Sequence, residues 1–385
     1  MHPILKPALR RGWRDLNTIQ FGVAPAHALV LGPVDTATGS FLQLLDGTRG
    51  LPLLRDEGKR MGLPDEHVDK LVRRLSAAGL LDDATGGGAA ADALRKRTAA
   101  LDRLRPDLAS LSVVTPGPGD GMRKLAARRA MRVQVRGAGR VGAVVASVLA
   151  GAGVGQVDVM EGGVVEPWDV APGGLPPESV GHRRDTATRR IVRQSAPDRP
   201  PRRGKKEAGA PRQPGEGDPG LALVIIAPRD GLDVHAPDPR TAEPLVASGT
   251  PHLYAGVIEG TGVVGPLVLP GTTACANCLA LDRADRDPTW PRLLAQWRSG
   301  RARRVHACDL ALSTTVAGLA AAHALAFLDG AAPASAGVRW EASVPGFDWH
   351  ARPVPPHLTC PCGAGVVDKG EHPAGDEQPH DTMAG

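Results

Sequence analysis

Aromatic residues are scarce in this chain. Phe, Trp and Tyr make up 3 % of the 385 residues, whereas all hydrophobic residues make up 42 %, so the core must consist mainly of Ala, Val and Leu. The formal net charge is +5, but the basic residues occur in runs without interleaved aromatic side chains. Such runs are typical of solvated linkers and argue against a nucleic-acid-binding surface.

The chain also lacks an apolar segment that would predict export or membrane insertion. Met1–Phe21 contains no apolar run of signal-peptide length. The longest apolar stretch, Leu310–Leu328, is interrupted by Ser313, Thr314, Thr315, Gly318 and His323. It predicts a buried helix of a soluble protein. We therefore expect a cytoplasmic protein with no membrane partner.

Cysteine is rare as well, and its distribution predicts a metal site. Four of the five cysteines form two tight pairs, Cys275 with Cys278 and Cys360 with Cys362. In a chain without an export signal, such pairs favour a metal over disulfides, and four thiolates suit tetrahedral structural Zn²⁺. Either Cys362 or His357 could complete the site, and free buried thiols are the alternative interpretation.

The length predicts two domains with linkers. Within residues 1–83, Thr18–Phe21 and His27–Leu31 have the pattern of two strands joined as a hairpin. Three helical segments follow, at Asp35–Leu45, Leu51–Met61 and Glu66–Ala78. A hairpin with three helices is the outline of a winged helix.

Three stretches have the composition of linkers or tails. Residues 84–130 begin with three glycines and an Ala/Arg segment with little to bury, which predicts a linker and a lead-in helix. Residues 199–220 contain five prolines and a basic run, which predicts a disordered surface loop. Residues 368–385 are polar and predict a flexible tail. The main domain is accordingly expected at residues 131–367.

A glycine-rich loop follows a short strand in this main domain. Val133–Arg136 alternates as a strand, and Gly137, Gly139 and Gly142 follow in the GxGxxG spacing, with Arg140 inside the loop. Ala143–Leu149 then continues as an apolar helix. The glycines permit a tight turn, and the helix N-terminus presents free N–H groups to a phosphate. The alternative is a glycine-rich turn without a ligand.

An acid follows the next strand at the distance expected for a nucleotide site. Val157–Met160 is the second strand, and Glu161 ends it, where an acid can hydrogen-bond ribose hydroxyls. The stretch Glu161–Val170 resembles a segment of the ThiF/MoeB family of ubiquitin-activating-enzyme-like adenylyltransferases, of the actinobacterial type. The stretch Val180–Ala187 resembles the helix start that carries this family's phosphate lysine, with Arg184 in place of lysine.

The resemblance covers roughly Met131–Gly363 and implies an α/β fold. It implies a Rossmann-like ThiF-type nucleotide-binding domain with a mainly parallel sheet, preceded by the small winged-helix α+β domain. It also implies ATP and Mg²⁺ as cofactors, an acyl-adenylate formed on the C-terminal carboxylate of a small protein or peptide, and a homodimer. Arg184 and Asp230 are the residues that could serve as its catalytic cation and acid.

The first domain carries a second resemblance. Leu44–Arg49, Leu75 and Ala78–Leu81 resemble the peptide-binding module of peptide-modification enzymes. The resemblance implies recognition of a precursor peptide, and a partner modification enzyme. A plain dimerisation or DNA-binding winged helix is the alternative.

This sequence departs from the family at its catalytic positions. Where the family has Asn-Leu-x-Arg-Gln, it has Asp169–Gly173, without an arginine. A guanidinium at Arg184 is not interchangeable with an ammonium, and Asp230 is out of register by a few residues. These departures raise a second hypothesis, a non-catalytic scaffold that presents a peptide to a partner enzyme. A nicotinamide-dependent oxidoreductase is a third, but it leaves the cysteine pairs unexplained. The role of Cys308 stays open.

Overall fold

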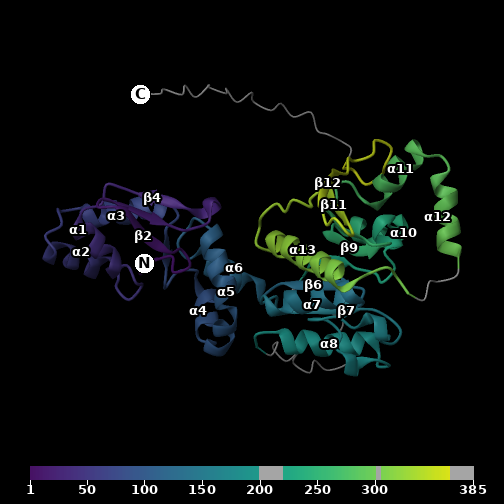
Figure 1. The fold of residues 1–385 in the computed structure, drawn as a ribbon, viewed down its shortest axis with the longest axis horizontal. Helices are drawn as coiled ribbons and strands as arrows, with labels where there is room; N and C mark the ends of the chain where they lie inside the picture. Colours follow the sequence, from purple (N-terminus) through teal and green to yellow (C-terminus); the bar gives the residue numbers. More distant parts are fainter. Residues whose placement is uncertain (199–219, 301–304, 365–385) are drawn as a thin grey trace, which may run out of the picture.

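The computed structural model describes residues 1–198, 220–300 and 305–364 of the chain. In chain order they form an N-terminal unit, a group of helices, and a larger α/β domain (Figure 1). The basic loop predicted at 199–220 and the tail predicted at 368–385 lie outside the described residues, apart from Gly220.

The N-terminal unit combines two small antiparallel sheets with helices around its own core. The predicted hairpin strands, β3 and β4, are paired, and β2 extends their sheet in the order β2-β3-β4. Strands β1 and β5 form the second sheet. Phe41, Leu54 and Leu75 are buried at the centre. The sequence pattern does not predict β2, because every residue of this strand is exposed and the apolar alternation is missing.

The elements of this unit have the following bounds. The strands are β1 (Pro3–Leu5), β2 (Arg11–Asp15), β3 (Thr18–Phe21), β4 (Leu29–Leu31) and β5 (Leu81–Asp83). The helices are α1 (Thr36–Phe41), α2 (Leu51–Arg60) and α3 (His67–Ala77), with short 3₁₀ turns at Pro25–His27 and Leu42–Leu44.

Residues 84–130 differ from the linker that their composition predicts. They form α4 (Ala89–Arg95), α5 (Thr98–Val114) and α6 (Asp120–Arg128), which pack around Leu94 and Leu104. This small core is mainly leucine and alanine, and α5, the longest of the three helices, has no strong apolar stripe in the sequence. The segment is therefore a folded connection between the N-terminal unit and the α/β domain.

The α/β domain is built on a sheet of seven strands in the order β12-β11-β10-β9-β8-β6-β7. Neighbours from β7 through β6 and β8 to β9 are parallel, and β10, β11 and β12 continue the sheet in antiparallel pairs. This topology confirms the predicted Rossmann-like α/β fold. The strands are β6 (Arg132–Arg136), β7 (Gln156–Met160), β8 (Leu221–Ile226), β9 (His252–Ile258), β10 (Thr261–Val268), β11 (Val338–Ser343) and β12 (His350–Pro353).

Helices cover both faces of this sheet. In β9, Leu253 and Ala255 belong to the core shared with α7 and α13, whereas Tyr254 belongs to the core on the side of α9, α10 and α11. This alternation is the period of two expected of a strand with both faces buried. The helices are α7 (Arg140–Gly151), α8 (Arg184–Ser195), α9 (Leu232–His235), α10 (Pro239–Ala247), α11 (Ala276–Arg286), α12 (Trp290–Ser299) and α13 (Leu310–Leu328), with 3₁₀ turns at Pro167–Asp169 and Pro177–Ser179.

The apolar stretch Leu310–Leu328 forms one helix, α13, as predicted. By length and composition alone this helix could cross a membrane. Its Leu312, Val316 and Ala320 are fully buried in the core formed with the sheet and α7. The apolar side chains of α13 therefore pack in the core of the α/β domain.

A buried ion pair joins the helical segment to the end of α13. Arg128 Nε and Nη2 donate to the two carboxylate oxygens of Asp329 at 2.8 and 2.6 Å, and the two side chains are 5 % and 8 % exposed. Arg128 Nη1 also donates to Ala152 O.

We expect Asp329→Asn to lower the free energy of unfolding by about 2 kcal/mol, because the Arg128 charge would stay buried without its counter-charge. The matched control is Asp102→Asn, which breaks the Asp102–Arg105 pair, with side chains 58 % and 75 % exposed. Such an exposed pair contributes roughly 0–1 kcal/mol. Urea denaturation of both variants measures the difference, and equal losses would contradict a stabilising role for the buried pair.

Candidate functional site: a glycine loop with a cluster of carboxylates and arginines

The glycine loop lies at the carboxyl edge of the parallel strands, between β6 and α7. A Cβ on Gly137 would lie 1.8 Å from Ala227 O, and a Cβ on Gly142 would lie 2.3 Å from Gly137 O. Close backbone approach therefore requires glycine at both positions, and Gly137 also has a φ of +119°. Gly139 is the N-cap of α7, so the first-turn N–H groups of this helix begin at the loop.

Glu161 lies beside this loop, as the sequence predicts. It follows β7 directly, and its Oε2 accepts a hydrogen bond of 3.2 Å from the backbone N–H of Ala138. Its Oε1 accepts another from Gly162. The Glu161 carboxylate is therefore held at the glycine loop.

Arg184 is buried among three carboxylates, which we name the carboxylate cluster: Glu161, Glu166 and Asp169. At the start of α8, its guanidinium lies 3.3 Å from Asp169, 3.6 Å from Glu161 and 3.9 Å from Glu166. It also donates to the carbonyl oxygens of Gly162 and Val164. The Arg184 side chain is only 6 % exposed, and its contacts join the segment after β7 to the start of α8.

Arg229 is a second cation in this cluster, and no motif in the sequence indicates a role for it. It follows β8, donates from Nε to Asp169 at 2.8 Å, and pairs with Glu166 through Nη2. A Cβ on Gly139 would lie 2.8 Å from Arg229 Cγ, so this side chain lies against the glycine loop. Although burial opposes the charge, Asp169 and Glu166 raise the pKa of Arg229. The sequence signal that could have indicated Arg229 is its position just beyond the carboxyl end of β8, a strand of the parallel sheet.

Asp230, the predicted catalytic acid, points to a neighbouring cavity. It is exposed, and its Oδ1 accepts a hydrogen bond from Leu232 N at 3.0 Å. The cavity has a volume of about 630 Å³ and is lined by loops after β8 and β9, by Trp290 and Trp297 of α12, and by Glu341. Asp230 thus shares the carboxyl edge of the sheet with Glu161 while facing this cavity.

Arg140 connects the glycine loop to the segment before α13. Its Nη1 donates to Cys308 O at 2.7 Å, and its buried Nε has no hydrogen-bond partner among the described residues. Burial raises the pKa of the Cys308 thiol, although Arg140 opposes this effect. A neutral, half-buried thiol fits a packing role for Cys308.

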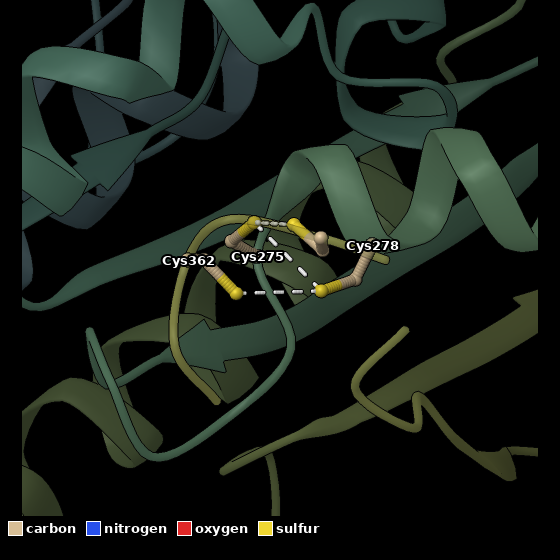
Figure 2. Close-up of side chains that lie close together, drawn as sticks. Cys275, Cys278 and Cys362 are labelled. Carbon is tan, nitrogen blue, oxygen red and sulfur yellow. Dashed lines mark hydrogen bonds between the residues drawn. The ribbon is translucent and has the colours of Figure 1, made fainter. Parts of the chain in front are cut away.

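The four paired cysteines meet in space, as the sequence predicts. Their Sγ atoms all lie within 4.8 Å of one another. Figure 2 shows the side chains of Cys275, Cys278 and Cys362 converging. The Cys278 and Cys362 sulfurs are 3.5 Å apart, and the Cys275 and Cys278 sulfurs are 3.9 Å apart. Four sulfurs at about 2.3 Å from a tetrahedral Zn²⁺ would lie about 3.8 Å apart, so the residues fit this ion.

Cys362, and not His357, lies with the other three sulfurs. His357 instead hydrogen-bonds Asp285 through Nε2 at 2.8 Å, and its Nδ1 lies 3.0 Å from Thr359 Oγ1. Burial raises the pKa of Cys278 to about 11, so without a cation this thiol would stay protonated. Such a donor set is suited to a soft metal ion that favours thiolates.

Comparison with known proteins agrees with this architecture. No curated protein sequence matches the chain. The structure of E. coli MccB with ATP is 14 % identical, with a TM-score of 0.65 over 94 % of this chain and 99 % of that one. The microcin C7 biosynthetic enzyme MccB in complex with N-formylated MccA is 13 % identical, with a TM-score of 0.63 over 94 % and 100 %. PaaA is 15 % identical, with a TM-score of 0.61 over 90 % and 98 %. The ThiF family matches residues 115–362, well over half of the chain, and this protein therefore belongs to the ThiF family.

Proposed function

We propose that this protein is an adenylyltransferase that binds ATP and activates the C-terminal carboxylate of a small protein or peptide. A carboxylate oxygen attacks the α-phosphorus, the bond from this phosphorus to the leaving oxygen breaks, and an acyl-adenylate and pyrophosphate result. The observation that carries the proposal is the glycine loop at the start of α7 with Glu161 beside it. A helix N-terminus favours a phosphate, and the acid would bind ribose. MccB, a protein of the same fold, has been solved with ATP.

The neighbouring cavity is the proposed position of the acceptor. It opens at the carboxyl ends of β8 and β9, where ligands of parallel α/β sheets bind. Asp230 lies at its wall and next to Arg229 in the chain. We assign Asp230 to the reacting groups and Arg184 to the positioning of the carboxylate cluster. Asp230 offers an exposed carboxylate, which fits Mg²⁺ as a hard cation that would neutralise the triphosphate.

The N-terminal unit is the proposed peptide-recognition domain of winged-helix type. Strand β4 lies at one edge of the sheet β2-β3-β4, and Leu29 and Val30 on it are 39 % and 52 % exposed. An extended peptide can add to such an edge by main-chain hydrogen bonds. MccB in complex with MccA supports a peptide as the partner class.

Structural zinc and a reducing compartment complete the proposal. The five cysteines are free of disulfides, which fits the cytoplasm, where thiols stay reduced. The cysteine pairs would hold Zn²⁺ and fasten the segment around Cys360 to α11. A homodimer is the expected state.

A specific observation favours a second candidate, a scaffold that binds a precursor peptide for a partner modification enzyme. Both arginines beside the glycine loop are paired with the protein's own carboxylates, Arg184 with all three and Arg229 with Glu166 and Asp169. Three carboxylates and two guanidiniums leave the cluster with no surplus positive charge for a triphosphate. A site in this state would bind nucleotide weakly.

Exchange of labelled pyrophosphate into ATP tests the proposed function. We expect the full-length protein to catalyse exchange in the presence of a library of short synthetic peptides with free C-terminal carboxylates. The matched control is the same library with C-terminal amides, which cannot form an acyl-adenylate and should give none. If neither library supports exchange, while both bind the protein with micromolar affinity, the adenylyltransferase is excluded and the scaffold is supported.

A further inference from the structure

The two arginines of the carboxylate cluster are held unequally. Arg184 is 6 % exposed and donates to the backbone at Gly162 and Val164 besides its ion pairs. Arg229 is 22 % exposed, and both of its hydrogen bonds in the described residues go to carboxylates. Arg184 is therefore fixed by the backbone, whereas Arg229 depends on side chains that could release it.

If the Arg229 side chain moved away, every buried charge of the cluster would keep a partner. Asp169, whose side chain is 4 % exposed, would keep Arg184 Nε at 3.3 Å and the Glu166 backbone N–H at 3.0 Å. The Glu166 side chain is 36 % exposed, so water can hydrate its carboxylate. The large desolvation penalty of an unpaired buried ion is thus avoided.

Arg229 also lies where a phosphate bound at the loop would meet it. Its Cγ is 2.8 Å from the position that a Cβ on Gly139 would occupy, and Gly139 is the N-cap of α7. The guanidinium reaches from there to Glu166 and Asp169. A rotation of this flexible side chain would therefore suffice to turn it toward the first turn of α7.

We propose that Arg229 is the phosphate-binding cation of this site. Its guanidinium leaves Glu166 and pairs with the triphosphate when ATP binds. This inference rests on the ATP site of the proposed function but does not require that adenylation follows. A triphosphate offers a guanidinium more charge and more acceptor oxygens than one carboxylate does. Glu166 is then a competitor of ATP for Arg229, and its charge sets how tightly ATP binds.

The competition predicts opposite effects for two substitutions, measured by calorimetric titration of the full-length protein with Mg²⁺-ATP. Arg229→Ala should weaken ATP binding about tenfold or more, because a charge-assisted hydrogen bond is lost. Glu166→Gln should strengthen it by a similar factor, because Arg229 is released. The double variant should bind ATP as Arg229→Ala does, since Glu166 acts through Arg229. The control is Arg183→Ala, which removes a neighbouring arginine 74 % exposed and should leave the affinity unchanged.

Other outcomes would overturn the inference. Tighter ATP binding by Arg229→Ala would show that the Arg229 side chain blocks the glycine loop and does not bind phosphate. Weaker binding by both single variants, with a lower melting temperature, would give Arg229 and Glu166 a structural role only. If the unaltered chain binds no ATP at millimolar concentration, binding by Glu166→Gln would still support the exchange, and its absence would refute it. Pyrophosphate exchange by the unaltered chain is a separate readout, so failure of the adenylyltransferase proposal can be distinguished from failure of this one.

Discussion

Protein carrying Cys275→Ser is expected to contain less than about 0.1 Zn²⁺ per chain after purification, against about one in the unaltered protein. A serine hydroxyl is a poor zinc ligand, and the remaining three sulfurs would lose the tetrahedral set. Cys275 is 4 % exposed and lies 3.6 Å from the Cys360 sulfur, so both pairs meet at this residue. Atomic absorption on protein exchanged into metal-free buffer measures the content.

Loss of the ion should also lower stability, because the pairs join the start of α11 to a segment more than eighty residues later in the chain. Folding free energy supplied by structural Zn²⁺ reaches roughly 10 kcal/mol in small zinc domains, and a part of it would be lost here. Limited proteolysis should then cut near Cys360 first.

Two controls make the zinc experiment specific. Cys308→Ser makes the same chemical change at a cysteine outside the cluster and should leave the zinc content at about one per chain. His357→Ala should also retain the metal, because His357 is bonded to Asp285. Full zinc retention by Cys275→Ser, or zinc loss in His357→Ala, would contradict the four-cysteine site.

Local signals explain what the sequence could predict. The strand before Gly137, the spacing of the glycines and the helix after them are adjacent in the chain, and the structure contains all of them. Gly137 and Gly142 are required by backbone contacts, which no other residue type would satisfy. The cysteine pairs could likewise be recognised in the sequence, because closely spaced thiols are typical of metal ligands.

The carboxylate cluster could not be predicted, because it is assembled from segments far apart in the chain. Asp169 follows β7, Arg184 begins α8, and Arg229 lies 60 positions after Asp169. Without the folded chain, Arg184 could be assigned only by resemblance, as the counterpart of a phosphate lysine. The structure surrounds it with carboxylates and carbonyl oxygens, which no neighbouring residue pattern indicates.

Two other differences have a simple physical origin. Helix α5 has no strong apolar stripe although it buries Leu104 and Leu111, so its sequence resembles that of a linker. Strand β12 is an edge strand with every residue exposed, and no apolar alternation in the sequence predicts it. In both cases the usual apolar periodicity is too weak to identify the element.

Gly139→Asp is expected to weaken the affinity for ATP about a thousandfold or more, without lowering the melting temperature. The φ of Gly139 is −84°, which any residue adopts, so no backbone strain arises. The new Cβ would lie 2.8 Å from Arg229 Cγ, so the Arg229 side chain would have to change its rotamer. At the N-cap of α7, aspartate is a favoured residue, since its carboxylate accepts hydrogen bonds from first-turn N–H groups. The substitution therefore stabilises the helix with the same N–H groups that a phosphate would need. It also adds a negative charge beside Glu161.

The matched control is Gly318→Asp, on the exposed side of α13, where a Cβ would meet nothing within 4 Å. This variant should bind ATP like the unaltered protein, at a small loss of stability of roughly 0.5 kcal/mol or less. Calorimetric titration with ATP and thermal unfolding of both variants separate binding from folding. An unchanged ATP affinity in Gly139→Asp would place the nucleotide away from this loop. A sharply lower melting temperature would instead show that Gly139 is required for the fold, which its ordinary φ argues against.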